Sequence, residues 1–198
     1  MDNELVFRIN LGTIFFLLSS IRLYYTVAAV KSGSSFSVSR VGSLRALFAL
    51  FLYVFILLSA FVYILAPSWL AWAALPLPPA LRWFGVGIGI GSVFLLFWVH
   101  RTLGRNFAAP GIIQARQTLI ISGPYHWVRH PMYTTFFTIS ATVALVATNW
   151  IIIIMCLLFG ILLPSVIQTE EQTLLEKFGD EYREYMQRTG RFLPRLRM

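Results

Sequence analysis

The sequence predicts an all-α integral membrane protein with about five transmembrane helices, a C-terminal helical hairpin and a cytoplasmic amphipathic tail helix. Of its 198 residues, 58% are hydrophobic and only 12% are charged, which is about half the charged share of a soluble domain. No residue between Leu5 and Thr169 is acidic. The apolar residues also gather in long runs, and about 20 helical residues suffice to cross a bilayer core of about 30 Å.

The predicted spans follow these apolar runs. Residues 5–30, 44–66 and 81–99 form the first three. Residues 131–169 carry no charge and are too many for one span, but they are about right for two. We place the break of this hairpin at residues 148–150, where a polar pair precedes a tryptophan of the type that favours membrane interfaces.

Three further segments have recognisable patterns. Residues 67–80 contain four prolines, which predicts an extended connector. Residues 85–91 alternate with glycine inside a span and lack the GxGxxG spacing, which favours close helix packing over dinucleotide binding. Residues 170–188 repeat apolar side chains at helical spacing, which predicts the tail helix, and Gly190 and Pro194 suit its end.

Basic residues indicate how the spans are oriented. They flank the first loop and occupy the third loop and the tail, whereas the second loop and the hairpin turn have none. The positive-inside rule therefore predicts an outside N-terminus, with the third loop and the C-terminus cytoplasmic. The acidic start differs from a signal peptide, so we expect the first span to be retained. The net charge of +8 favours membrane lipids over nucleic acid as partners, because it is scattered between apolar spans.

A polar island, residues 123–133, holds two of the three histidines at the start of the fourth span. Pro131 suits the first turn of a helix and disfavours helical backbone at His130, so His130 is expected at the helix start, where backbone N–H groups are free. Glu170 and Glu171 follow the fifth span on the same side. They can cap the tail helix, but their position also predicts a site shared with His130. The single cysteine, Cys156, excludes an internal disulfide and multi-cysteine metal sites.

Short blocks recur in order through the C-terminal half: residues 103–107, 117–120, 123–125, 129–133, 170–171 and 178–182. Together they resemble the isoprenylcysteine carboxyl methyltransferase family, which belongs to a wider group of integral membrane methyltransferases that includes phospholipid N-methyltransferases. The resemblance covers roughly residues 103–194. It suggests one integrated domain, in which residues 1–100 form a three-span scaffold or substrate-access region and residues 101–198 form the cofactor-binding catalytic region.

The resemblance implies S-adenosylmethionine as cofactor, bound at the cytoplasmic face, and no metal. The implied cofactor contacts are Gln114, Gln117, Thr118, Leu119, Ile120, Tyr125, His130, Pro131, Met132, Tyr133 and Glu170. The candidate catalytic residues are His130, Arg129, Tyr133 and Glu171. We expect Glu170 to hold the polar end of the cofactor and His130, with the backbone around it, to fix the remainder.

The expected acceptor is a lipophilic small molecule or a lipid-modified group. Carboxyl O-methylation of an isoprenylcysteine-like compound comes first, and methylation of a phospholipid or a small thiol is the alternative. The sequence departs from the family at Gln117, where a histidine is common, at Thr135, where a small residue is common, and at Val166, where an arginine is implicated in substrate handling. Arg129 and Arg101 remain as candidates to replace that arginine.

Two other classes of function remain open. Membrane reductases that use NADPH carry a similar Arg-His-Pro-x-Tyr stretch, although the Glu170–Glu171 pair and the five predicted spans speak against this class. A non-catalytic binding or transport protein is the third class. The gathering of polar groups on one face speaks against it.

Overall fold

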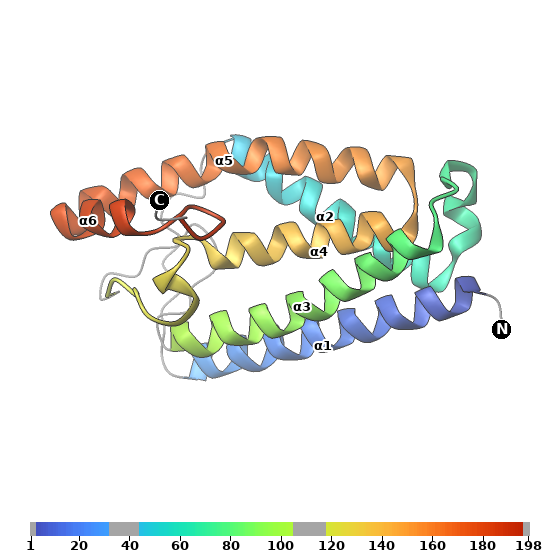
Figure 1. Cartoon of the computed structure of the whole chain (residues 1–198), viewed down its shortest axis with the longest axis horizontal. Helices are drawn as coiled ribbons and strands as arrows, with labels where there is room; N and C mark the ends of the chain where they lie inside the picture. The colour runs from blue at the N-terminus through green and yellow to red at the C-terminus, as the bar shows by residue number, and fades with distance from the viewer. Residues whose placement is uncertain (1–2, 32–43, 105–117, 196–198) are drawn as a thin grey trace.

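The computed structural model describes residues 3–31, 44–104 and 118–195, and the regular structure in these ranges is helical (Figure 1). The long helices α1, α3, α4 and α5 extend along the long axis of the molecule (Figure 1). The elements in chain order are α1 (Asn3–Lys31), α2 (Leu44–Leu65), η1 (Pro67–Ala73), α3 (Pro79–Leu103), η3 (Gly123–His126), α4 (Pro131–Ala147), α5 (Trp150–Phe178) and α6 (Asp180–Arg188).

The predicted fold class, an all-α integral membrane protein, is confirmed. In the described ranges, α1, α2, α3 and α5 are long and apolar enough to cross a membrane. Helix α4 is apolar but has 17 residues, or about 26 Å at 1.5 Å per residue, which is short of a bilayer core of about 30 Å. The number of spans therefore stays a prediction.

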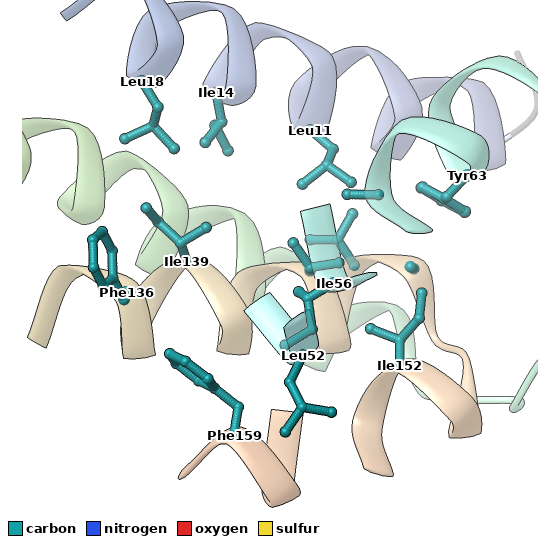
Figure 2. Packing of buried hydrophobic residues seen from close by; sticks show 14 of the residues in the cluster. Leu11, Ile14, Leu18, Leu52, Ile56, Tyr63, Phe136, Ile139, Ile152 and Phe159 are labelled. Carbon is teal, nitrogen blue, oxygen red and sulfur yellow. The ribbon is translucent and has the colours of Figure 1, made fainter. Parts of the chain in front are cut away.

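The core lies between the helices and not on their lipid-facing sides. Apolar side chains from α1, α2, α4 and α5 point toward one another (Figure 2). Those labelled in Figure 2 are Leu11, Ile14, Leu18, Leu52, Ile56, Tyr63, Phe136, Ile139, Ile152 and Phe159. Large exposed side chains such as Phe16, Phe51 and Phe94 face outward, as expected where lipid replaces water.

The glycine run packs α3 against α4, as predicted. A β-carbon at Gly85 would lie 2.7 Å from the β-carbon of Leu145, and one at Gly89 would lie 2.8 Å from Thr142 Cγ2. The intervening Gly87 has no such neighbour within 4 Å. Glycines four residues apart therefore form the face that lets the two helices approach.

The hairpin turn between α4 and α5 lies where the sequence predicts it. Thr148 adopts a left-handed conformation with φ of 47°, and Asn149 caps α5. The Asn149 side-chain oxygen accepts hydrogen bonds from the backbone N–H groups of Ile151 and Ile152 at 3.0 and 3.3 Å. Its amide donates to the carbonyl of Leu70 at 3.0 Å, which ties the turn to η1.

Two predicted segments differ from the structure. Residues 67–80 were expected to be an extended connector, but η1 forms a 3₁₀ helix from Pro67, and α3 begins at Pro79. Proline is well tolerated at the first position of a helix, so these two prolines start helices and do not prevent them.

The tail helix was predicted to begin at residue 170, which is wrong. Helix α5 continues to Phe178, and a separate amphipathic helix, α6, begins only at Asp180. The charged residues that begin at residue 170 suit water better than lipid, but they do not end the helix. The break comes at Gly179, whose φ of 53° is a conformation that glycine adopts at little cost.

A polar cluster joins four helices at the end that carries the N-terminus. Arg82 Nη1 pairs with Glu4 Oε2 at 2.8 Å, and Arg82 Nε donates to the carbonyl of Val146 at 3.1 Å. The hydroxyl of Tyr63 donates to Glu4 Oε1 at 2.5 Å. The sequence did not predict this cluster, because its members are far apart in the chain.

Candidate active site

A pocket lies at the end of the molecule opposite the N-terminus. It is enclosed by the last residue of α3, the segment before α4, the start of α4, the end of α5, and α6, all of which meet at this end (Figure 1). Its lining residues are Leu103, Thr118, Leu119, Ile120, Tyr125, Arg129, His130, Met132, Tyr133, Glu170, Leu174, Phe178, Tyr182 and Tyr185.

The start of α4 holds His130 as the sequence predicts. Pro131 is the first residue of the helix, and His130 precedes it in a non-helical conformation with φ of −123° and ψ of 57°. His130 is only 5% exposed, yet its side chain lines the pocket. The proline therefore keeps His130 out of the helix, at the point where its imidazole meets the pocket.

Glu170 faces the pocket together with Tyr133. The hydroxyl of Tyr133 donates a hydrogen bond of 2.8 Å to Glu170 Oε2. The two residues come from α4 and α5, so this bond joins the helices of the hairpin at the pocket wall. The carboxylate of Glu170 is half-buried and forms part of the pocket surface.

Glu171 does not line the pocket and is 3% exposed. Its Oε1 accepts a hydrogen bond from Arg129 Nε at 3.0 Å and lies 3.3 Å from His130 Nε2. Its Oε2 pairs with Arg191 Nη2 at 2.5 Å. A buried carboxylate is costly unless it is paired on both oxygens, and these three partners provide that pairing.

Arg129 is engaged beyond this ion pair. Its Nη1 donates to the carbonyl oxygens of Met186, at 3.0 Å, and of Thr189. These two carbonyls lie at and just after the end of α6. The guanidinium thus connects the start of α4 to the tail, and its donors are directed at protein groups.

Three tyrosines form the aromatic side of the pocket. Tyr185 donates a hydrogen bond of 2.6 Å to the carbonyl of Tyr125, which links α6 to η3. Tyr182 is 1% exposed, and within the described part of the chain its hydroxyl has no hydrogen-bond partner. Burial, with the nearby carboxylates of Glu170 and Glu171, raises the pKa of Tyr182 above its ordinary value. Its hydroxyl is therefore a neutral, buried polar group on a residue that lines the pocket.

Most of the predicted site residues come together at this pocket. Those that line it are Thr118, Leu119, Ile120, Tyr125, Arg129, His130, Met132, Tyr133 and Glu170. Pro131 is buried beside it, and Glu171 lies behind it. Gln114 and Gln117 lie outside the described residues. The roles assigned to all these residues stay predictions.

The sequence did not indicate the wall formed by Leu103, Leu174, Phe178, Tyr182 and Tyr185. Four of these belong to the apolar stripe that predicts the tail helix, and a stripe of this kind is more often a buried face than a binding surface. The sequence feature that could have indicated this wall is the pair Tyr182 and Tyr185, because a buried tyrosine usually needs a partner for its hydroxyl. Arg191 has no comparable signal.

Known proteins resemble part of this chain, and the family match includes most of the residues that line the pocket. Residues 85–176 match the model of the isoprenylcysteine carboxyl methyltransferase (ICMT) family, which confirms the resemblance seen in the motifs. The cobalt-zinc-cadmium resistance protein CzcN of Cupriavidus metallidurans is 36% identical over 97 residues, which is 48% of this chain and 44% of that protein.

Two further relatives have similar coverage. The nickel-cobalt-cadmium resistance protein NccN of Alcaligenes xylosoxydans xylosoxydans is 34% identical over 53% of this chain and 50% of its own length. The methanethiol S-methyltransferase of Pseudomonas deceptionensis is 30% identical over 59% of this chain and 45% of its own length. The matches thus span about half the length of these curated relatives.

Proposed function

With residues 85–176 similar to the isoprenylcysteine carboxyl methyltransferase family, we propose that this integral membrane protein transfers a methyl group from S-adenosylmethionine to a lipophilic acceptor. The observation that carries the proposal is the pocket itself. Among the described residues, it combines one carboxylate, an imidazole, aromatic walls and an unsatisfied tyrosine hydroxyl at one end of a set of apolar helices.

The described residues fit such a cofactor. Its ammonium and sulfonium groups are cationic, and Glu170 offers the pocket a carboxylate that Tyr133 holds in place. Leu119, Ile120 and Phe178 provide apolar surface for a base. The hydroxyl of Tyr182 is buried without a partner among the residues that the structure describes, and a polar ligand would relieve this cost.

When bound, the cofactor supplies an activated methyl group, so the protein needs to contribute little acid–base chemistry. The residues of this chain bind and orient. Tyr133 fixes Glu170, and the start of α4 fixes His130. The aromatic side chains of α6 exclude water from the reacting groups. Positioning of the reactants and exclusion of water can supply the rate acceleration that a direct methyl transfer needs.

The location suits reactants from two phases. The pocket lies at the end of the molecule where α1 and α3 finish with Lys31 and Arg101, and by the positive-inside rule we assign this end to the cytoplasm. A water-soluble cofactor reaches the pocket from that side, and a lipophilic acceptor reaches it from the bilayer. We therefore expect membrane lipids around the site and no nucleic-acid partner.

The charge of the pocket bears on the acceptor. Val166, at the position of the family arginine, packs against the apolar core. Arg129 lines the pocket but is bonded to Glu171 and two carbonyl oxygens. Arg101 lines a separate groove with Phe94 and Phe97. Neither arginine therefore supports recognition of an acceptor carboxylate in the described part of the pocket.

A small or lipophilic thiol is accordingly our second candidate acceptor, beside the isoprenylcysteine-like carboxylate and the phospholipid. The relative named methanethiol S-methyltransferase supports it, and so does the absence of a free cation among the described lining residues. Two other relatives are named for metal resistance. In residues 3–31, 44–104 and 118–195, no three His, Cys, Asp or Glu side chains gather as a metal site.

Isothermal titration calorimetry of the purified protein with S-adenosylhomocysteine and with NADPH tests the cofactor. Binding of the first compound is expected, and binding of NADPH alone would sink the proposal in favour of a reductase. Transfer of a labelled methyl group is then measured with N-acetyl-S-farnesylcysteine, an alkanethiol and phosphatidylethanolamine vesicles. Methylation of the farnesylcysteine alone would remove the thiol and the phospholipid as candidate acceptors.

A further inference from the structure

The tail after α6 runs beside the start of α4. Residues 189–192, which we name the tail strap, make three backbone hydrogen bonds with residues 127–130. Gly190 N–H donates to the carbonyl of Trp127 at 3.2 Å, Arg129 N–H donates to Gly190 at 2.8 Å, and His130 N–H donates to Arg191 at 3.2 Å. The strap therefore supplies hydrogen-bond partners to backbone groups just before α4, which the helix itself does not satisfy.

Side chains anchor the same segment on both sides. The hydroxyl of Thr134 donates to the carbonyl of Phe192 at 3.0 Å, and the ring of Phe192 packs edge-to-face on Phe137 with centroids 5.2 Å apart. At the other end of the strap, Thr189 is 3% exposed and accepts a hydrogen bond from Arg129. A β-carbon at Gly190 would overlap the carbonyl oxygen of Leu193, so the strap closes into a compact turn.

Arg191 reaches His130 by two routes. Its backbone carbonyl accepts the His130 N–H, and its guanidinium pairs with Glu171 Oε2 at 2.5 Å. The other oxygen of Glu171 lies 3.3 Å from the His130 imidazole. Arg191 thus holds both the backbone of His130 and the carboxylate of Glu171, which lies behind the His130 ring. Arg191 itself is absent from the pocket lining.

We propose that Arg191 is a positioning residue, and that docking of the tail strap completes the cofactor pocket. This inference rests on the proposed function and adds a requirement to it. With the strap undocked, the N–H groups of Arg129 and His130 lose their acceptors, and Glu171 loses one of its cationic partners. The imidazole and guanidinium that line the pocket then lose the fixed positions that ligand binding uses.

Thermodynamic linkage makes the requirement measurable. If strap docking favours cofactor binding, cofactor binding must favour strap docking by the same free energy. Amide hydrogen exchange in residues 189–192 is therefore expected to slow when S-adenosylhomocysteine is added. A strap that serves only overall stability would slow no more than the amides of helices remote from the pocket, because a bound ligand stabilises the whole folded state.

The test compares three variants by calorimetry with S-adenosylhomocysteine. Arg191→Met is expected to weaken binding about tenfold or more, equivalent to about 1.4 kcal/mol. Arg191→Lys keeps a cation near Glu171 and should recover part of that loss. Arg195→Met is the matched control, because Arg195 is exposed and its guanidinium donates to the carbonyl of Gln187 in α6. This variant should bind S-adenosylhomocysteine as tightly as the wild type.

Each result decides the proposal. Wild-type affinity in Arg191→Met, or strap exchange that the bound ligand slows no more than exchange in remote helices, overturns it. Thermal unfolding without ligand shows whether Arg191→Met stays folded, and the Lys variant keeps the test valid if it does not. Failure of the wild type to bind the ligand at all contradicts the proposed function instead, so the two failures are distinguishable.

Discussion

Glu170 and Glu171 are consecutive residues of α5, but their carboxylates contact different parts of the protein. Glu170 lines the pocket and accepts a hydrogen bond from Tyr133, whereas Glu171 lies behind the pocket and pairs with Arg129 and Arg191. Consecutive residues of an α-helix point about 100° apart, because one turn takes 3.6 residues. The helix therefore divides the acidic pair between a ligand-facing group and a structural group.

Replacing each glutamate by glutamine should separate these two tasks. Glu171→Gln leaves the buried Arg129 and the partly exposed Arg191 without their carboxylate. Loss of one partner from a buried ion pair costs about 3–5 kcal/mol. We expect a clear fall in melting temperature. Glu170→Gln should melt near the wild-type temperature but bind S-adenosylhomocysteine more weakly. The idea fails if both variants change stability equally and neither changes affinity, as measured by thermal unfolding and calorimetry.

The two glycines Gly85 and Gly87 provide a matched pair of substitutions. Gly85→Ala places a methyl group 2.7 Å from Leu145 Cβ, and overpacking of this kind typically costs about 1–3 kcal/mol. Gly87→Ala meets nothing within 4 Å and should be neutral or stabilising by up to about 1 kcal/mol, because alanine suits a helix better. Thermal unfolding in one detergent compares them. Equal effects would contradict the close contact of α3 with α4.

Asn149 has two functions at the hairpin turn, and two variants distinguish them. Asn149→Ala removes the cap of α5 and the bond to Leu70, so we expect a loss of about 1 kcal/mol or more. Asn149→Asp keeps an oxygen for the cap but removes the donor to Leu70. Its melting temperature should lie between those of the wild type and the alanine variant, and an equal loss in both would assign the effect to η1 alone.

Tyr182→Phe removes a hydroxyl that has no partner among the described residues while it keeps the ring. Replacing an unsatisfied buried polar group by an apolar one of the same shape is neutral or stabilising. We therefore expect unchanged or higher stability without ligand, together with weaker binding of S-adenosylhomocysteine. Tyr185→Phe is the contrast, because its hydroxyl donates to Tyr125 and its loss should lower stability. A destabilised Tyr182→Phe would show that the hydroxyl has a partner within the protein.

Stability should fall in alkaline solution because of the same aromatic cluster. Burial raises the pKa values of Tyr125, Tyr182 and Tyr185 above the ordinary value of 10.0. Below about pH 10 these phenols are neutral in both the folded and unfolded protein, so their contribution is complete. At higher pH the unfolded chain loses protons that the folded chain keeps, and unfolding becomes more favourable. Near-ultraviolet absorbance should show these phenols ionising only together with unfolding, and earlier ionisation would contradict their burial.

Hydrophobicity and turn chemistry were enough to predict most of the fold. The first three spans and the turn at Asn149 follow from apolar length and from a polar break, since lipid allows few alternatives to a helix. The end of α5 did not follow, because the transfer from lipid to water leaves a helix intact. Its position depends on the positive φ of Gly179, which a charge pattern does not reveal.

The candidate site was predictable only in part. The start of α4 follows from the pair His130 and Pro131, and family motifs indicate most of the other lining residues. Arg191 joins the site through contacts with residues 20 and more positions away in the chain, in a segment without periodicity. The direction of Glu171, away from the pocket, depends on the rotation of α5 about its axis, and hydrophobic periodicity does not fix that rotation for two adjacent polar residues.

Helix α5 is continuous from Trp150 to Phe178, so the acidic pair is carried on a helix that is long and apolar enough to cross the lipid. Its 29 residues extend for about 43 Å, well beyond a bilayer core of about 30 Å. Long spans answer a thinner or thicker bilayer by changing their tilt. A change in the tilt of α5 would move Glu170 relative to Tyr133 on the shorter α4, so their hydrogen bond of 2.8 Å is the contact on which bilayer thickness would act.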